Sequence, residues 1–352
     1  MRDTRSRWTV AFVALAVVAL IVGATVISNA GRPASGQPQG SDSAAPPGIS
    51  EPTGSLVAIA TASPTPSSPP GGPQSLLPSP SPPSSAPRVA SGHVWWVVLE
   101  NHEYGSIVGS GQAPYFNALA AHYGLATNYY ATGHPSEPNY VALVAGSTLG
   151  VATDGTYRLQ ASSIFSQLAA AGRPWRVYAQ DDQPGCFMGS STGGGADGPG
   201  APGIYARKHN PAISLASVAD SAAQCRNIEP LRDFDPAAGA FEMIVPNLVN
   251  DMHDGSVAQG DAFLRAFVPR ITSSVAFRSG GVLFITFDEG SSDAGSHGDA
   301  GGHVATLIVA ADVTPGYRDR AYLDHFALLR TTEKLLGLAC LANSCHRVLI
   351  GH

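Results

Sequence analysis

Two apolar segments that each run directly into an acidic residue constrain the fold of this chain most. Residues 93–99 read HVWWVVL and are followed by Glu100, and residues 281–287 read GVLFITF and are followed by Asp288. Short apolar runs rich in β-branched and aromatic residues predict strands that are buried on both faces of a parallel sheet. Because ligands of open α/β sheets bind beyond the carboxyl ends of the strands, we expect both acidic residues at one edge of the sheet.

Strand-like and helix-like segments alternate through the rest of the folded region. Strands are expected at residues 125–130, 175–180, 241–245 and 303–310, and helices at residues 113–123, 140–145, 162–171, 257–267 and 325–336. This alternation predicts an α/β fold, a three-layer α/β/α sandwich with a mostly parallel central sheet.

The first 30 residues predict export of the chain. Residues 1–7 carry three arginines, and residues 9–27 are uncharged and almost wholly apolar. This run is long enough to span a bilayer and longer than most signal-peptide cores, which favours an N-terminal membrane anchor. Residues 28–30, Ser-Asn-Ala, instead resemble the cleavage site of a signal peptide. Both alternatives leave the arginines on the cytoplasmic side and the remainder outside, either secreted or anchored to the membrane.

Composition divides the remaining chain into a linker and one domain. Residues 31–88 are dominated by Pro, Ser, Gly and Ala and predict a disordered linker. Residues 89–352 are long enough for one domain with a substantial core. The net charge of −6 gives no basic field, so nucleic acid is not an expected partner. We expect a monomer that contacts membrane only through its N-terminal segment.

The four cysteines of the chain agree with an oxidising compartment. Cys340 and Cys345 are close in sequence, and Cys186 and Cys225 both lie in loop-like stretches. Two local disulfides, Cys186–Cys225 and Cys340–Cys345, are the natural pairing there. A zinc site made of these cysteines is not favoured, because no CxxC pair occurs.

The two strand ends offer four side chains with the oxygen donors that a hard cation prefers. They are Glu100, Asn101, Asp288 and Glu289. Oxygen-rich sites suit Mg²⁺, Ca²⁺ or Mn²⁺, whereas added histidines shift the preference toward Zn²⁺ or iron. The alternative for any one carboxylate is that it caps a following helix. Because two strands end in acidic residues at the same edge of the sheet, we favour metal binding by these side chains over two unrelated helix caps.

A hydroxyl lies between these strands, in the segment HPSEPNY at residues 134–140. Ser136 lies just before the helix expected at residues 140–145, and a serine that starts a helix is most often an N-cap. In the alternative interpretation, Ser136 faces the N–H groups of the helix terminus, where a phosphate would bind. Coordination to a metal would lower the pKa of Ser136 and make it a nucleophile. Metal ligands together with a hydroxyl held beside them are typical of the active site of a phosphate-ester hydrolase.

Three further segments place histidine beside charged or glycine neighbours. The first, at residues 207–209, suits recognition of phosphate. The second, at residues 251–254, forms a dense set of metal-ligating groups. Glycines in the third permit close approach of the backbone. The candidates are Arg207, Lys208 and His209 for phosphate, Asp251, His253 and Asp254 for metal, and His303 for either.

The segments ENH, HPSEPNY, RKHNP, NDMHDGS, FDEG and GGHV, in this order, resemble the bacterial phosphoesterase family of secreted acid phosphatases and phospholipase-C-like enzymes. That family belongs to the alkaline phosphatase superfamily, and the resemblance covers about residues 93–345 and is greatest to actinobacterial secreted acid phosphatases. It implies an alkaline-phosphatase-like sandwich. The implied roles are metal binding for Glu100, Asn101, Asp288 and Glu289, nucleophile for Ser136, and lining of the phosphate site for His134, His209, His253 and His303. We assign Asn139, with Arg207 and Lys208, to substrate binding.

Three functions remain open from the sequence. The first is an exported metal-dependent acid phosphatase that hydrolyses small-molecule or lipid phosphate monoesters through a phosphoserine. The second is a phosphodiesterase of phospholipase C type, which needs room and apolar contacts for a second ester arm. The third is a surface-displayed binding module that keeps the fold without catalysis.

Overall fold

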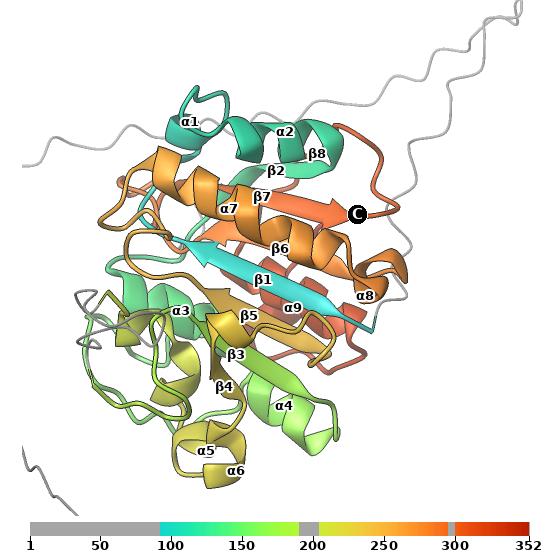
Figure 1. Cartoon of the computed structure of the whole chain (residues 1–352). Helices are drawn as coiled ribbons and strands as arrows, with labels where there is room; N and C mark the ends of the chain where they lie inside the picture. The colour runs from blue at the N-terminus through green and yellow to red at the C-terminus, as the bar shows by residue number, and fades with distance from the viewer. Residues whose placement is uncertain (1–91, 190–203, 295–299, 352) are drawn as a thin grey trace, which may run out of the picture. The chain divides into compact units, whose positions relative to one another are not determined.

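The computed structural model describes residues 92–189, 204–294 and 300–351 (Figure 1). The leader and linker predicted at residues 1–88 lie outside these ranges. None of the helices within the described ranges is long and apolar enough to cross a bilayer.

One sheet organises the described part of the chain. Its strands follow the order β4-β3-β5-β1-β6-β7-β2-β8, and β9 pairs with β2. β7 runs antiparallel to both of its neighbours, β6 and β2, and the other paired strands are parallel. The predicted mostly parallel sheet is therefore confirmed. The strands are β1 Val94–Leu99, β2 Gly124–Tyr130, β3 Trp175–Ala179, β4 Ile228–Pro230, β5 Phe241–Val245, β6 Val282–Phe287, β7 His303–Ala310, β8 Tyr317–Asp319 and β9 Leu323–Asp324.

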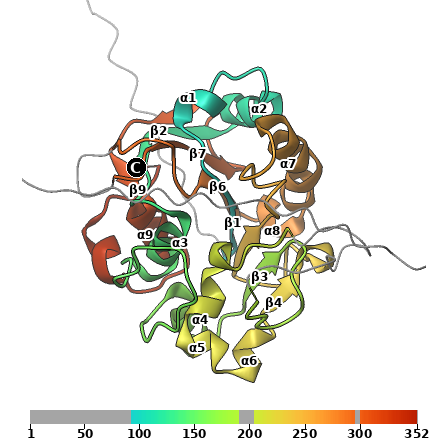
Figure 2. The same ribbon diagram turned by 90° about the vertical axis from the view of Figure 1, so that its left-hand side faces the viewer.

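Helices cover both faces of this sheet, which confirms the three-layer sandwich. Helices α3 and α9 lie together against one face, and α2, α7 and α8 lie against the other (Figures 1 and 2). The α-helices are α1 Tyr104–Ile107, α2 Pro114–His122, α3 Ser136–Ala145, α4 Ile164–Ala170, α5 Ala216–Ala219, α6 Ala222–Cys225, α7 Val257–Thr272, α8 Val275–Arg278 and α9 His325–Leu335. The 3₁₀ turns are Arg207–His209, Pro211–Ser214, Leu231–Asp233 and Ala342–His346.

Strand β1 lies at the centre and fixes where the acidic residues emerge. All six of its residues are buried, and it pairs with β5 on one side and β6 on the other. Leu99 is in register with Phe287, so Glu100 and Asp288 leave the sheet side by side. The Asp288 N–H donates to the Leu99 carbonyl at 2.9 Å, which continues the ladder to the site.

Helix α3 begins four residues earlier than predicted. The expected start was residue 140, but the helix includes Ser136, Glu137 and Pro138. Proline is tolerated there because the first-turn N–H groups of a helix have no intrahelical acceptor. All ten residues of α3 are buried, including the polar Ser136, Glu137 and Asn139 of its first turn.

Both predicted disulfides are present. Cys186 is bonded to Cys225, and Cys340 is bonded to Cys345. The second closes a short loop that packs on the C-terminal end of α3, where the Asn343 N–H donates to the Gly146 carbonyl.

Candidate active site

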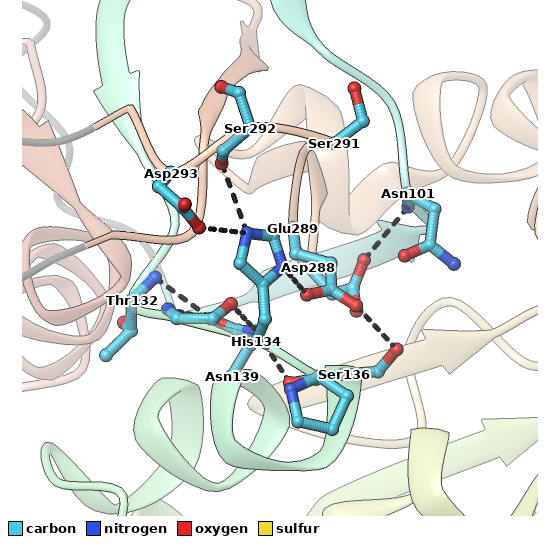
Figure 3. A network of polar contacts seen from close by, with 12 residues as sticks. Asn101, Thr132, His134, Ser136, Asn139, Asp288, Glu289, Ser291, Ser292 and Asp293 are labelled. Carbon is cyan, nitrogen blue, oxygen red and sulfur yellow. Dashed lines mark hydrogen bonds and ion pairs between the residues drawn. The ribbon is translucent and has the colours of Figure 1, made fainter. Parts of the chain in front are cut away.

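The Ser136 hydroxyl belongs to a polar cluster that also includes Glu289 and His134 (Figure 3). Pro135 occupies the N-cap position of α3, so Ser136 is the first helical residue and the N-cap interpretation is wrong. Its side chain is 1% exposed. The Oγ atom lies 3.2 Å from Glu100 Oε2 and 3.1 Å from Glu289 Oε1. A hydroxyl between two carboxylates and at a helix N-terminus is placed for chemistry on an anion.

Buried carboxylates surround this hydroxyl. Glu100 and Asp288 are fully buried, and burial raises the pKa of each well above its usual range, helped by repulsion from Asp288 for Glu100 and from Glu289 for Asp288. Tyr140 donates its hydroxyl to Glu100 Oε1 at 2.5 Å, and the Asn101 N–H donates to Asp288 Oδ1 at 3.1 Å. Asp288 Oδ2 is buried without a hydrogen-bond partner among the described residues. So many acidic groups in one buried place can all be ionised only beside a compensating positive charge.

Two histidines complete a possible metal-binding group. The ligand atoms of Glu100, His209 and His253 all lie within 4.8 Å of one another. His209 Nε2 lies 3.1 Å from Glu100 Oε1, yet it makes no hydrogen bond within the described ranges. Burial, helped by nearby cations, lowers the pKa of His209 well below its usual value, which leaves the neutral imidazole that metals bind. These unpartnered atoms and the donor set fit a divalent cation.

Asp251 and Asp254, which were predicted as metal ligands, lie behind these histidines. Asp251 Oδ2 is 3.1 Å from His209 Nδ1, and Asp254 Oδ1 is 2.7 Å from His253 Nδ1. The other oxygen of Asp251 accepts the His253 N–H at 2.8 Å. Burial raises the pKa of Asp251 to about 7. Carboxylates on Nδ1 orient an imidazole so that Nε2 faces the metal.

Glu289 is held from the opposite side by His134. His134 Nδ1 contacts Glu289 Oε2, and its Nε2 lies 3.1 Å from the Ser292 carbonyl (Figure 3). Burial lowers the pKa of His134, but the contacts with Ser292 and Glu289 outweigh it and the pKa is raised. The histidine therefore favours its charged form beside Glu289.

Glu103 fixes the loop that follows Glu289, although the sequence analysis did not single it out. Its Oε1 accepts the N–H groups of Ser291 and Ser292 at 3.1 and 2.9 Å, and the Ser292 hydroxyl at 2.7 Å. A Cβ on Gly302 would lie only 2.7 Å from the same oxygen. The sequence did contain a signal for Glu103, because it follows Glu100 and Asn101 within the same four residues and is the third acidic or amide side chain there.

Lys208 alone among the predicted substrate-binding residues lies against Ser136 in the contacts of the described residues. Its Nζ atom lies 3.5 Å from Ser136 Oγ. Asn139 instead accepts the Thr132 and Gly133 N–H groups, at 2.9 and 3.0 Å, and so shapes the loop before Ser136. Arg207 is buried and its guanidinium faces Glu137 and the Gly155 carbonyl.

His303 is engaged in an aromatic stack. Its ring lies between Tyr104 and Tyr130, with centroids 4.4 and 5.0 Å away, and its Nε2 is 3.1 Å from the Thr127 carbonyl. Of the two glycines before it, Gly302 lies against Glu103, and Gly301 lies against Ala131 and Gly133.

Comparison with known proteins agrees with this geometry. Residues 95–339 match the Phosphoesterase family. The chain is 32% identical over 249 residues to a phosphatidylinositol-3-phosphatase of Mycobacterium tuberculosis, covering 70% of this chain and 77% of that protein. It is 28% identical over 268 residues to an acid phosphatase of Aspergillus fumigatus, covering 73% of this chain but only 58% of that protein.

A solved structure of an alkaline phosphatase superfamily protein from Vibrio parahaemolyticus aligns with a TM-score of 0.48 and 12% identity, over 75% of this chain and 72% of that one. The family match covers most of the sheet and every segment that surrounds Ser136. The chain therefore belongs to the Phosphoesterase family of phosphoric ester hydrolases.

Proposed function

We propose that this protein is an exported metal-dependent acid phosphatase that hydrolyses phosphate monoesters through a phosphoserine at Ser136. The observation that carries the proposal is the position of Ser136 Oγ, which lies within 3.2 Å of two buried carboxylates and 3.5 Å from Lys208 Nζ. The names of the acid phosphatase relatives and of the phosphatidylinositol-3-phosphatase support a monoester substrate, either a small molecule or a lipid.

The buried donors around Ser136 are assigned to a divalent cation. Glu100, His209 and His253, whose donor atoms lie together, would hold it, with Asp288 and Glu289 as further ligands. Asn101 orients two of the carboxylates. A cation held there would neutralise the carboxylates and would lower the pKa of the serine hydroxyl. Asp251 and Asp254 act one step away, by holding the imidazoles.

The reaction uses Ser136 as a covalent carrier of the phosphoryl group. Its Oγ attacks phosphorus in line and gives up its proton, and the phosphorus–oxygen bond to the leaving alcohol breaks as that alcohol takes up a proton, so no net proton is gained or lost. Lys208 stabilises charge on the equatorial oxygens of the phosphoryl group. Water then hydrolyses the phosphoserine and releases inorganic phosphate.

A substrate pair tests the proposal against its alternatives. The full chain would be assayed on p-nitrophenyl phosphate and bis-p-nitrophenyl phosphate, with and without a chelator, and its metal content measured. We expect monoester hydrolysis that the chelator abolishes and added divalent metal restores. Preference for the diester would indicate the phospholipase C type, and inactivity on both esters would indicate a binding module.

Export is supported by the two disulfides, which form and persist in oxidising compartments. We expect phosphatase activity on intact cells or in the culture medium. Activity that appears only after lysis, with the N-terminus uncleaved and the thiols reduced, would contradict export.

A further inference from the structure

Asp154, in the loop between α3 and α4, connects two parts of the site that the sequence keeps apart. Its Oδ2 accepts from Lys208 Nζ at 2.9 Å, and the same Nζ lies 3.5 Å from Ser136 Oγ. Its Oδ1 accepts the Glu137 N–H at 3.1 Å, in the first turn of α3. One carboxylate therefore contacts both the helix that carries the nucleophile and the ammonium beside it.

The partial exposure of this ion pair limits what it contributes to stability. The side chains of Lys208 and Asp154 are 23% and 36% exposed, and ion pairs of this kind contribute little to folding. Lysine carries its charge on four rotatable bonds, so an unpaired Lys208 would spread over many positions. The effect of Asp154 therefore falls on the placement of the ammonium rather than on the fold.

The position of the pair also fits a role toward substrate. Asp154 and Lys208 line a cavity of about 320 Å³ together with Gly155, Thr156, Ala206 and Arg207. A phosphate ester that reaches Ser136 past Lys208 has this cavity beside it. An ammonium fixed at the boundary between cavity and nucleophile meets the phosphoryl oxygens as they move in the transition state.

We propose that Asp154 is a positioning residue that holds the Lys208 ammonium against the phosphoryl group at Ser136, an inference that rests on the function proposed above. Replacing Asp154 by asparagine separates its two contacts. Asp154→Asn keeps an oxygen that accepts the Glu137 N–H, but it removes the negative charge that faces Lys208. Because the variant also removes a charge that repels an anionic substrate, its KM is expected to stay unchanged or to fall.

The test is a double-mutant cycle in the full chain, with p-nitrophenyl phosphate as substrate. Asp154→Asn should lower kcat about tenfold without raising KM, because it weakens an interaction made in the transition state. Lys208→Ala should lower kcat at least as much. The double variant should match Lys208→Ala within about twofold, since Asp154 acts through Lys208.

A matched control is Asp220→Asn, which breaks the exposed Arg158–Asp220 ion pair in the same part of the molecule and should leave kcat unchanged. Losses that multiply in the double variant, or full activity in Asp154→Asn, would overturn the role of Asp154 while leaving the phosphatase function intact. A folded wild-type protein that neither hydrolyses esters nor binds inorganic phosphate would instead overturn the proposed function and this inference with it.

Discussion

The Oγ atom of Ser136 is the group whose removal distinguishes covalent catalysis from other mechanisms. Ser136→Ala should lower kcat/KM by more than about 10³-fold, because it removes the nucleophile and no core packing. Metal content and the thermal unfolding midpoint should stay close to those of the wild type. Ser217→Ala, on the exposed side of α5, is the control for a lost hydroxyl. Activity within tenfold of the wild type would assign the nucleophile to another residue.

Asp288 tests the assignment of the buried carboxylates to a metal. Asp288→Asn should lower metal occupancy and phosphatase activity together, because a hard cation loses a charged oxygen ligand. Metal analysis of the purified protein and the assay of the same sample measure both quantities. Asp312→Asn, at an exposed position, should change neither. Full metal content with full activity would show that Asp288 is not a ligand.

Residue types and their order along the chain identified most of the cluster around Ser136. Glu100, Asp288 and Glu289 follow apolar strands, and strand ends of a parallel sheet share an edge. Sequence spacing does not tell whether the aspartate or the histidine of a contacting pair is the metal ligand. Asp251 was therefore predicted as a ligand, although it contacts Nδ1 of His209. Asp154 had no signal of its own, because its role depends on a contact with Lys208 54 residues away.

At the level of elements, the loops around β7 have a tight steric requirement at Gly302. This residue has a φ of +94°, and a Cβ there would lie 2.8 Å from Gly290 Cα and 3.0 Å from the Ser292 carbonyl oxygen. Gly302→Ala should lower both stability and activity, because the Glu289 loop must move. Gly109→Ala is the matched control, with a φ of +81° and no atom within 4 Å of its Cβ.

The comparison of the two glycine variants separates strain from crowding. Backbone strain in the left-handed region is expected to cost about 1–2 kcal/mol at both positions. Crowding adds roughly 1–3 kcal/mol at Gly302 alone. Urea denaturation measures the sum, and equal losses with equal activity would contradict the close approach at Gly302.

Helix α9 carries a buried carboxylate that makes stability depend on pH. Glu333 is fully buried, and burial raises its pKa to about 7, against the lowering effect of the Ser344 hydroxyl, which donates to it at 2.8 Å. Since the folded-state pKa lies above the unfolded value of about 4.3, the stabilising contribution is complete below that value and is lost as the pH rises through 7. The loss should be on the order of 3 kcal/mol.

Glu333→Gln removes this titration. The free energy of unfolding, measured by urea at pH 5 and pH 8, should fall less with pH in the variant than in the wild type. Glu229→Gln, at a partly exposed position, should keep the wild-type pH dependence. A variant with the same slope as the wild type would show that Glu333 is ionised in the folded protein.

Long periodic segments of the sequence predicted the elements well, and short ones did not. The strands expected at residues 241–245 and 303–310 have the observed bounds. Strands β4, β8 and β9 were missed because two or three residues carry no pattern of alternation. The reversed direction of β7 was also missed, although residues 288–302 lack the helical pattern that a parallel crossover requires.

At the scale of the whole molecule, the two disulfides close loops of very different length. Cys186 and Cys225 are separated by 39 positions, and Cys340 and Cys345 by 5. Paired Cys→Ser substitution of the first should therefore lower the free energy of unfolding by about 1–2 kcal/mol more than that of the second. Chemical denaturation of both variants measures the difference. Four free thiols in non-reducing peptide maps of the purified protein would contradict both bonds.

The central position of β1 has a consequence for how the protein is made. Its two hydrogen-bonded neighbours, β5 and β6, are synthesised roughly 150 and 190 residues after it. At about 5–20 residues per second, the ribosome delivers β6 some 10–40 s after β1. Until β5 is made the segment VWWVVL has neither sheet partner, and until β6 is made it lacks one of them. The central strand of the sheet therefore lacks at least one of its partners for most of synthesis, and the sheet is completed late.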